Sequence, residues 1–165
     1  MALLTVTGKS TQATRTTRTS VGEKLLDRYN AGGHIQAYQF YYKNETGGTL
    51  AANSIIQLCT IGPCHVLPTS VITTTALGTG RTLDVGTQEY VNTAGTTVTS
   101  EIDAFLDGLD VSSVVSNTMF GSDTASNTYG DGVTVDGQVD ILAKIIGGTF
   151  PANGIVQGII FAITL

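Results

Sequence analysis

A period of two in the apolar residues near the C-terminus is the feature that most restricts the fold. In VTVDGQVDILAKII, residues 133–146, every odd position is apolar or glycine. Successive side chains of a β-strand point to opposite faces of a sheet, so this period predicts a long strand with one buried face. Gly137 lies within the run, and we expect a β-bulge there.

The next apolar run, IVQGIIFAITL (155–165), is apolar on both of the faces that a strand would present. GGTFPANG before it has the composition of a turn, so we expect the two runs to pair as an antiparallel hairpin. Ile160 lies on a face that we expect a second layer or another subunit to cover. The run is shorter than the roughly 20 residues of a membrane-spanning helix, so no membrane segment is expected. The opposite face carries the larger side chains and is expected to enter the core: Ile159, Phe161, Ile163 and Leu165.

Shorter β-prone runs, separated by glycine and proline, fill much of the remaining chain. They lie at residues 34–43, 54–61, 65–78 and 81–86. Only 13% of the residues are charged, which favours strands, tight turns and a surface largely covered by other protein. Roughly seven to nine short strands at this spacing predict an all-β protein, an antiparallel β-sandwich or jelly-roll-like domain.

Two segments have a helical pattern. Residues 100–110 begin with a capping sequence, SEID, and predict one short helix within the sandwich. Asp103, Asp107 and Asp110 would share one face of it, as a solvated surface or a patch that faces a basic partner. Residues 21–33 have a weaker helical pattern that ends in glycines. The apolar positions of the first helix are three and four residues apart: Ile102, Phe105, Leu106 and Leu109.

Charge is distributed unevenly along the chain. Residues 1–43 contain six basic and two acidic residues, whereas residues 44–165 contain two basic and eleven acidic residues. The early segment also lacks apolar periodicity, so we divide the chain into a basic N-terminal arm (1–43) and a sandwich body (44–165). The arm is too poor in cations and interleaved aromatics to predict nucleic-acid binding. We expect it to dock on an acidic protein surface through four cations: Lys9, Arg15, Arg18 and Arg28.

No pattern in the sequence predicts an enzyme. The chain has two histidines, His34 and His65, and lacks the motifs of serine hydrolases, zinc proteases and P-loop proteins. Cys59 and Cys64, in CTIGPC, are expected to be buried free thiols, with a disulfide as the alternative. Together with His65 they do not form a standard zinc site. We therefore expect no catalytic residue, metal or cofactor.

The aromatic residues of HIQAYQFYYK (34–43) form the densest aromatic cluster of the chain. We expect them to pack in the strand core and at a subunit interface, and as a lesser alternative to offer a platform for sugars. The absence of tryptophan disfavours the sugar platform. The residues predicted at the subunit interface are Tyr38, Phe40, Tyr42 and Ile160.

The order of several blocks resembles small virion structural proteins of tailed bacteriophages. The blocks are NETGGTLAANSIIQLCTIGPCHVLPTSVITTT, RTLDVGT, FLDGLDVSS and TVDGQVDILAKIIGGTFPANGIVQGIIFAITL, which together cover about residues 44–164. The resemblance implies a β-sandwich capsid decoration (cement) protein that binds the major capsid protein and stabilises the phage head. It also implies contact with symmetry-related copies, expected as a homotrimer, on the outer surface of the virion.

Without a secretory signal, the protein is expected to be made in the cytoplasm of the host bacterium. Two other functions stay open. A tail-fibre or head-fibre module would bind host-surface glycans through exposed aromatics or the 112–132 segment. A carbohydrate-active enzyme would need a pair of carboxylates about 5–10 Å apart in a cleft.

Overall fold

The structure, a computed structural model, describes residues 8–9, 34–45, 50–120 and 132–164. These residues form strands and connecting turns, and they contain no helix. The strands are β1 (Gly8–Lys9), β2 (Ile35–Lys43), β3 (Ile55–Ile61), β4 (Cys64–Val66), β5 (Val71–Thr74), β6 (Thr82–Thr87), β7 (Tyr90–Val91), β8 (Thr97–Val98), β9 (Glu101–Asp110), β10 (Val115–Thr118), β11 (Val133–Val135), β12 (Val139–Ile146) and β13 (Ile155–Thr164).

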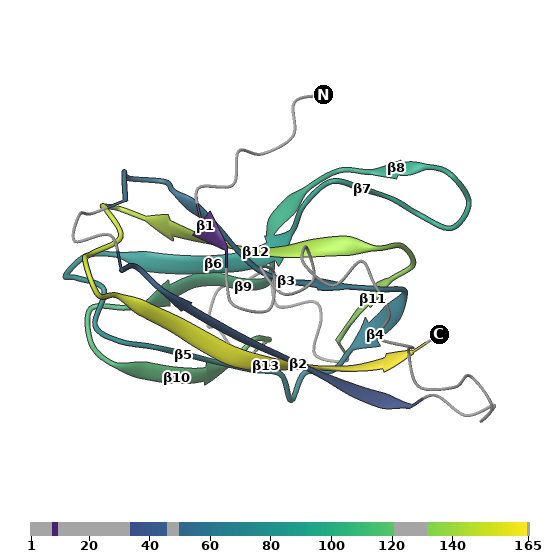
Figure 1. Cartoon of the computed structure of the whole chain (residues 1–165), viewed down its shortest axis with the longest axis horizontal. Coiled ribbons are helices and arrows are strands. Elements are labelled where there is room, and N and C mark those ends of the chain that lie inside the picture. Colours follow the sequence, from purple (N-terminus) through teal and green to yellow (C-terminus); the bar gives the residue numbers. More distant parts are fainter. Residues whose placement is uncertain (1–7, 10–33, 46–49, 121–131, 165) are drawn as a thin grey trace.

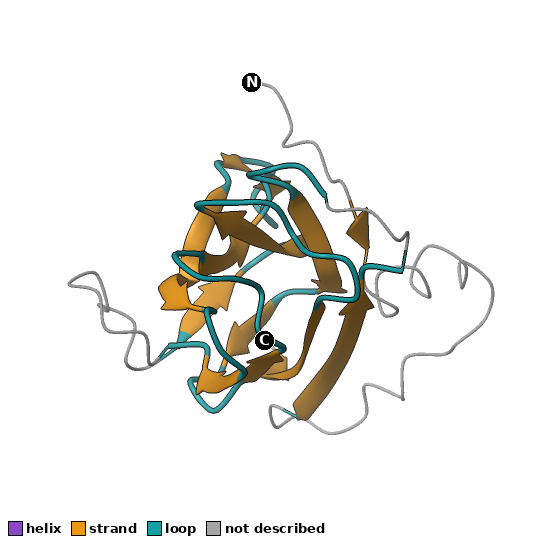
Figure 2. Ribbon diagram, turned by 90° about the vertical axis from the view of Figure 1, so that its left-hand side faces the viewer, coloured by secondary structure: helices purple, strands orange, loops and turns teal. Residues whose placement is uncertain are grey.

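Two sheets form the body of the protein. Sheet A has the order β1-β3-β12-β6-β9, and sheet B has the order β10-β5-β13-β4-β11, with β2 on the other edge of β13. Figure 1 shows the two sheets as layers, and Figure 2 shows the strands enclosing one interior. Apart from the short parallel contact of β1 with β3, the ladders are antiparallel. The predicted all-β antiparallel sandwich is confirmed.

The core lies between the inward faces of the two sheets. In β12 the odd positions of the period-two pattern are buried, as predicted, with Val139, Ile141 and Ile145 at most 2% exposed. β3 supplies Ile56, Leu58 and further buried residues to the same cluster. Edge-to-face aromatic pairs close the core: Tyr42 with Phe150, and Phe105 with Phe120.

The predicted hairpin of residues 133–146 and 155–165 is wrong. β12 pairs with β3 and β6 in sheet A, whereas β13 pairs with β2, β4 and β5 in sheet B. The segment between them therefore crosses from one sheet to the other. An apolar period identifies the face of a strand that is buried, but it carries no information about the neighbouring strand.

The long strand predicted over residues 133–146 divides at Gly137. β11 pairs with β4 in sheet B, and β12 lies in sheet A, so the chain changes sheets between them. Gly137 forms an isolated bridge with Asn92, and a Cβ atom there would lie 2.4 Å from the carbonyl oxygen of Val91. Glycine is needed for this close approach of two backbones rather than for the predicted bulge. The register shift of β12 against β3 lies between Ile141 and Leu142.

The two faces of β13 are the reverse of those predicted. Ile160 is fully buried, while Ile159, Phe161 and Ile163 are only partly buried on the outer face of sheet B. The reason is the space needed by the aromatic rings of β2. A Cβ atom on Gly158 would lie 2.6 Å from the Phe40 ring, so the inward face of β13 needs glycine at this position.

The helix predicted over residues 100–110 is wrong, since these residues form the edge strand β9 of sheet A. Thr87 pairs with Glu101 and Val85 with Leu106, so β9 has extra residues that bulge out of the ladder. The bulge gives β9 a run of consecutive buried residues, which imitates helical spacing. The weaker helical pattern at residues 21–33 lies outside the described residues.

Candidate interaction surfaces

The predicted arm (1–43) meets the body through two described strands, β1 and β2. Gly8 and Lys9 form β1, which runs parallel to β3 with Gly8 opposite Ile56 and Lys9 opposite Gln57. The other cations predicted to dock the arm, Arg15, Arg18 and Arg28, lie outside the described residues. Their docking role stays a prediction, as does the division of the chain at residue 43. The predicted strand at 34–43 is present as β2, which pairs with β13 along nine residues.

Three of the four residues predicted at a subunit interface lie in the core of the body. Phe40 is 4% exposed, Tyr42 is 8% exposed and Ile160 is fully buried. Tyr38 is partly buried, and its hydroxyl donates a hydrogen bond to Oε1 of Gln36. Burial raises the pKa of both Tyr38 and Tyr42 above that of free tyrosine. These inward-facing side chains of β2 and β13 therefore stabilise the sandwich itself.

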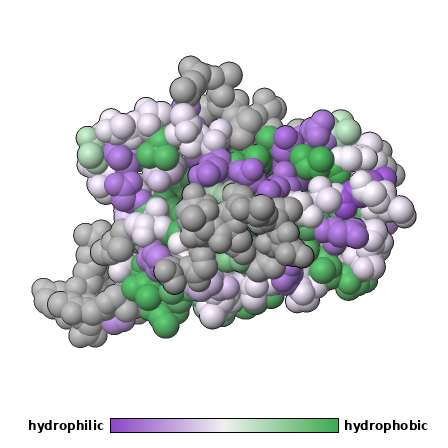
Figure 3. Space-filling model, turned by 180° about the vertical axis from the view of Figure 1, so that it is seen from behind, coloured by the Kyte–Doolittle hydropathy of each residue, from purple (hydrophilic) through white to green (hydrophobic). Residues whose placement is uncertain are grey.

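The outer face of sheet B carries an apolar strip, and the sequence pattern assigned its three β13 residues to the core. It consists of Ile35, Ile159, Phe161 and Ile163, and Ile35 is 67% exposed. Ile35 lies opposite Ile163 across the β2–β13 ladder. The sequence showed that the three β13 residues share a face. The size of their side chains could not show that this face points outward. Figure 3 shows further apolar side chains in separate patches among polar ones on the back of the molecule.

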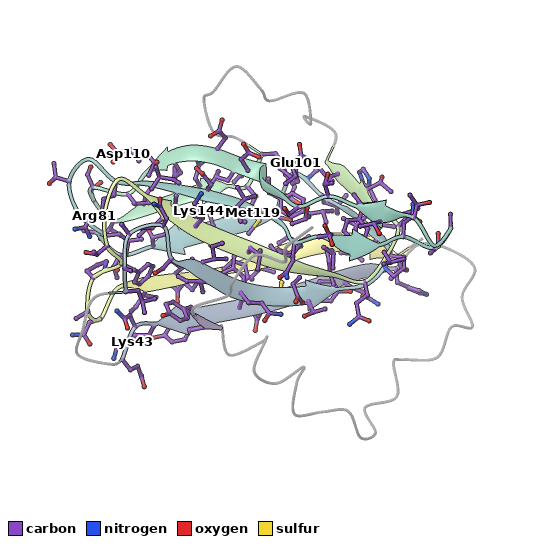
Figure 4. All side chains as sticks on the ribbon, turned by 90° about the horizontal axis from the view of Figure 1, so that it is seen from above. Lys43, Arg81, Glu101, Asp110, Met119 and Lys144 are labelled. Atoms are coloured by element: carbon purple, nitrogen blue, oxygen red, sulfur yellow. The ribbon has the colours of Figure 1, made fainter. Side chains whose placement is uncertain are left out.

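The edge of sheet A formed by β9 is acidic. Glu101, Asp103 and Asp110 are exposed along β9, and Asp107 lies partly buried between them. Figure 4 shows Glu101 and Asp110 toward the two ends of this strand, with Lys144 on the same sheet. The aspartates predicted on one helix face thus lie together on a strand.

Asp84 on the neighbouring strand β6 belongs to this acidic edge. Burial raises the pKa of Asp84, a hydrogen bond from the Gly108 N–H (2.9 Å) lowers it, and the carboxylates of Asp107 and Asp103 raise it again. Lys144 has a weaker lowering effect. The effect of these two carboxylates on Asp84 shows that negative charge is concentrated here, where a basic partner would be favoured.

Arg81, the one arginine of the body, has a structural role. Its guanidinium Nη1 donates hydrogen bonds to the carbonyl oxygens of Leu77 and Thr149 (2.5 Å to the latter). It therefore connects the loop before β6 to the loop between β12 and β13. These bonds assign the partly buried Arg81 a role in holding the two loops together.

The cysteines and histidines do not assemble a reactive site. Cys59 and Cys64 are free and buried, as predicted. Burial raises the pKa of the Cys64 thiol to about 11 and that of Cys59 well above its usual value. His65 Nδ1 lies 2.9 Å from the Thr134 hydroxyl across the β4–β11 ladder. Among the described residues, no group of three or more histidine, cysteine or acidic side chains could hold a metal ion.

The described part of the chain contains no helix that could cross a membrane.

Comparisons with known proteins show a likeness in fold. No protein-family model matches the chain, and no curated protein does. A chain of the cyanophage Pam1 capsid asymmetric unit is similar over 87% of this chain and 94% of that one, with 15% identity and a TM-score of 0.53. A chain of the Ralstonia phage GP4 capsid is similar over 85% of this chain and 89% of that one, with 19% identity and a TM-score of 0.50.

Proposed function

We propose that the protein is a structural component of a phage virion. The observation that carries the proposal is the similarity to chains of two phage capsids, which spans almost the whole of each chain rather than one motif. Two buried polar side chains of the described residues stabilise turns and strand ends, as a structural role requires. The two examples are Asn44, which donates to the Pro151 carbonyl, and Ser70, which bonds to β13.

The finer proposal is a decoration (cement) protein on the outer surface of the capsid. It would bind the major capsid protein and neighbouring copies of itself, as a trimer, after synthesis in the host cytoplasm. A protein that binds only the assembled shell stabilises that shell by mass action, in proportion to the occupancy of its sites. Such a role needs a rigid body and a contact surface but no catalytic group.

Charge supports a role for the arm in docking. Residues 1–43 have more basic than acidic residues, and the body has the opposite balance. Acidic groups on the major capsid protein or on the β9 edge of another copy would attract Lys9, Arg15, Arg18 and Arg28. Contacts of this kind weaken as salt screens the charges, over a Debye length of about 10 Å at 0.1 M salt.

Deleting residues 1–20 tests the arm. The truncated protein should keep its β-sheet circular dichroism but decorate purified capsids at a small fraction of the full-chain occupancy. A matched variant, Arg15→Gln with Arg18→Gln, should show an intermediate loss that shrinks as salt rises, because salt also screens the contacts of the unaltered chain. Undiminished occupancy of the truncated protein would show that the arm does not dock.

Locating the protein in the particle tests the proposal as a whole. The protein is produced with an affinity tag, and purified particles are labelled with an antibody against the tag. In electron micrographs the label should lie on the outer shell. Label on the tail or fibres would contradict the decoration role while leaving a virion role intact. Label absent from the particle would contradict both.

The glycan-binding alternative loses most of its aromatic platform. Tyr38 and Tyr42 face the interior, and Tyr41, which is 41% exposed, is the tyrosine of β2 on the outer face. Tyr41→Ala is therefore expected to leave adsorption of the phage to its host unchanged. A large loss of adsorption would favour the fibre module over the capsid protein.

A further inference from the structure

β1 and β3 meet at the outer edge of sheet A. β3 is bonded to β12 on its inner side. On its outer side, the described residues that pair with it are Gly8 and Lys9, which lie opposite Ile56 and Gln57. The part of β3 from Leu58 to Ile61 extends beyond this short contact. Figure 1 shows β1 as a small separate strand beside the long strands of the sheet.

This edge is one that a protein must protect. β3 has the sequence IIQLCTI, and six of its seven residues are buried. An apolar strand with an open edge offers unpaired N–H and C=O groups to any other chain, so natural proteins cover such edges. The segment that pairs with Ile56 and Gln57 of β3 precedes β2 in the chain and does not come from a turn next to β3.

The number of residues between β1 and β2 sets how far β1 can reach. Residues 10–34 separate β1 from β2, a stretch of 25 residues. A chain of that length can span roughly 80 Å when extended, at about 3.3 Å per residue. A compact domain of this size has a radius of gyration of roughly 15 Å. The β1 segment can therefore reach the β3 edge of an adjacent copy as well as its own.

Charge allows β1 to dock on an adjacent copy as well as on its own body. The arm is basic and the body acidic, so an arm is attracted to any body, including one that belongs to another chain. Pairing between chains would use the same parallel register, Gly8 with Ile56 and Lys9 with Gln57, and would need no new contact. Exchange of identical elements is a low-cost route to oligomers for this reason.

We propose that β1 is exchanged between copies, so that β1 of one chain completes the β3 edge of sheet A in a second chain. The partner is thus a second copy of this protein, and its recognition site is the outer edge of β3 at Ile56 and Gln57. The inference rests on the proposed function in one respect: copies of the protein must lie next to one another in an assembly.

Cysteine cross-linking tests the exchange. Paired residues on adjacent strands have Cα atoms about 4.8 Å apart, within the range that a disulfide bridges. A Lys9→Cys chain and a tagged Gln57→Cys chain are refolded together, assembled and oxidised. Exchange predicts a covalent dimer of one tagged and one untagged chain. The native thiols do not compete, because Cys59 and Cys64 are buried. Lys9→Cys with Thr93→Cys, at the exposed turn of the β7–β8 ribbon, is the matched control and should give no dimer.

The double variant, with Lys9→Cys and Gln57→Cys in one chain, separates the outcomes. Bonds between chains, seen as dimers or larger ladders on a non-reducing gel, support the exchange. Bonds only within chains overturn it, and so does the absence of any bond, since β1 would then not pair with β3. As a second measurement, deleting residues 1–9 should lower the mass of the assembly in light scattering and leave the β-sheet spectrum unchanged. An unchanged mass would count against the exchange.

Failure of this inference differs from failure of the proposed function. Virions that contain the protein but yield only bonds within chains would overturn the exchange alone. Bonds between chains in a protein absent from virions would overturn the function alone.

Discussion

At the scale of single residues, a buried side-chain hydroxyl takes the place of a backbone hydrogen bond at the point where a strand is interrupted. Between β4 and β5 the Ser70 hydroxyl donates to the Leu67 carbonyl (2.7 Å) and accepts from the Phe161 N–H (3.0 Å). Ser70 is fully buried, so water cannot take the place of these bonds. β13 pairs with both β4 and β5, and Ser70 lies between those two strands. Its hydroxyl bonds the Phe161 N–H at this gap, so that the backbone group is not left unsatisfied.

Ser70→Ala should lower the free energy of unfolding by about 1–3 kcal/mol, because it leaves the Phe161 N–H without its acceptor. The measurement is equilibrium unfolding in urea. Thr73→Ala is the control, since its hydroxyl bonds to Ser116 at the surface and its loss should change the free energy by less than about 0.5 kcal/mol. Equal losses in the two variants would contradict this role of Ser70.

Gly158→Ala should also destabilise the fold. The added Cβ would lie 2.1 Å from the Val71 carbonyl oxygen and 2.6 Å from the Phe40 ring, so backbone must shift. We expect a loss of about 1–3 kcal/mol on urea unfolding. Gly62→Ala is the matched control, because a Cβ atom at Gly62 meets nothing within 4 Å. A Gly158→Ala protein as stable as the Gly62→Ala protein would contradict the close packing of β13.

The thiols predict how stability depends on alkaline pH. Burial raises the pKa of Cys64 from 9.0 to about 11, so the unfolded chain releases this proton at lower pH than the folded chain. The contribution of the buried Cys64 thiol to the free energy of unfolding is therefore fully present below pH 9. It declines as pH rises from about 9 to about 11. Unfolding in urea across this range measures the decline, and a Cys64→Ala variant should show a smaller one. A decline of the same size in both proteins would exclude the thiol as its source.

At the scale of elements, the sequence identified strands better than it identified their neighbours. The period of two located β12, and the apolar run located β13 as an inner strand, because both patterns reflect burial of the strand itself. Their pairing was not predictable, since the choice of sheet depends on the crossing at residues 147–154. β9 was mistaken for a helix because its bulge places three consecutive residues in the core, Ala104, Phe105 and Leu106.

The same limit applies to the candidate surfaces. Composition correctly indicated two buried thiols and an acidic body, which need only the sequence. The predicted interface residues of β2 are its even-numbered aromatic residues. From the sequence, either the even-numbered or the odd-numbered residues of this strand could have faced inward. Only the ladder with β13 fixes Phe40 and Tyr42 in the core, and it leaves Ile35 at the surface.

Adjacent residues of β13 give a direct test of which face is buried. Ile160→Asp places an unpaired charge in the core and should prevent folding, seen as loss of soluble protein and of the β-sheet spectrum. Phe161→Asp, on the outer face, should leave a folded protein with a modest fall in melting temperature. The reverse result, a folded Ile160→Asp and an unfolded Phe161→Asp, would contradict the assignment of the faces.

At the scale of the whole molecule, the sandwich is closed by pairs that are distant in sequence. β2 and β13 run side by side along nine residues, although more than a hundred residues separate them (Figure 1). Sheets built from such pairs must close large loops before any contact forms, which makes folding slow.

Refolding from urea is therefore expected in milliseconds to seconds rather than in microseconds, as for other sandwiches of this kind. Stopped-flow fluorescence of the tyrosines measures the rate. A main phase complete within a few tens of microseconds would show that local contacts control folding instead.

The central position of β13 also has a consequence for synthesis in the cell. A ribosome makes β2 early and β13 last among the described strands, so sheet B has no centre until residues 155–164 have emerged. A nascent chain therefore cannot present a finished surface to a partner. An assembly that binds the folded body can therefore begin only after these residues have been translated. Incomplete chains are in this way kept out of the growing assembly.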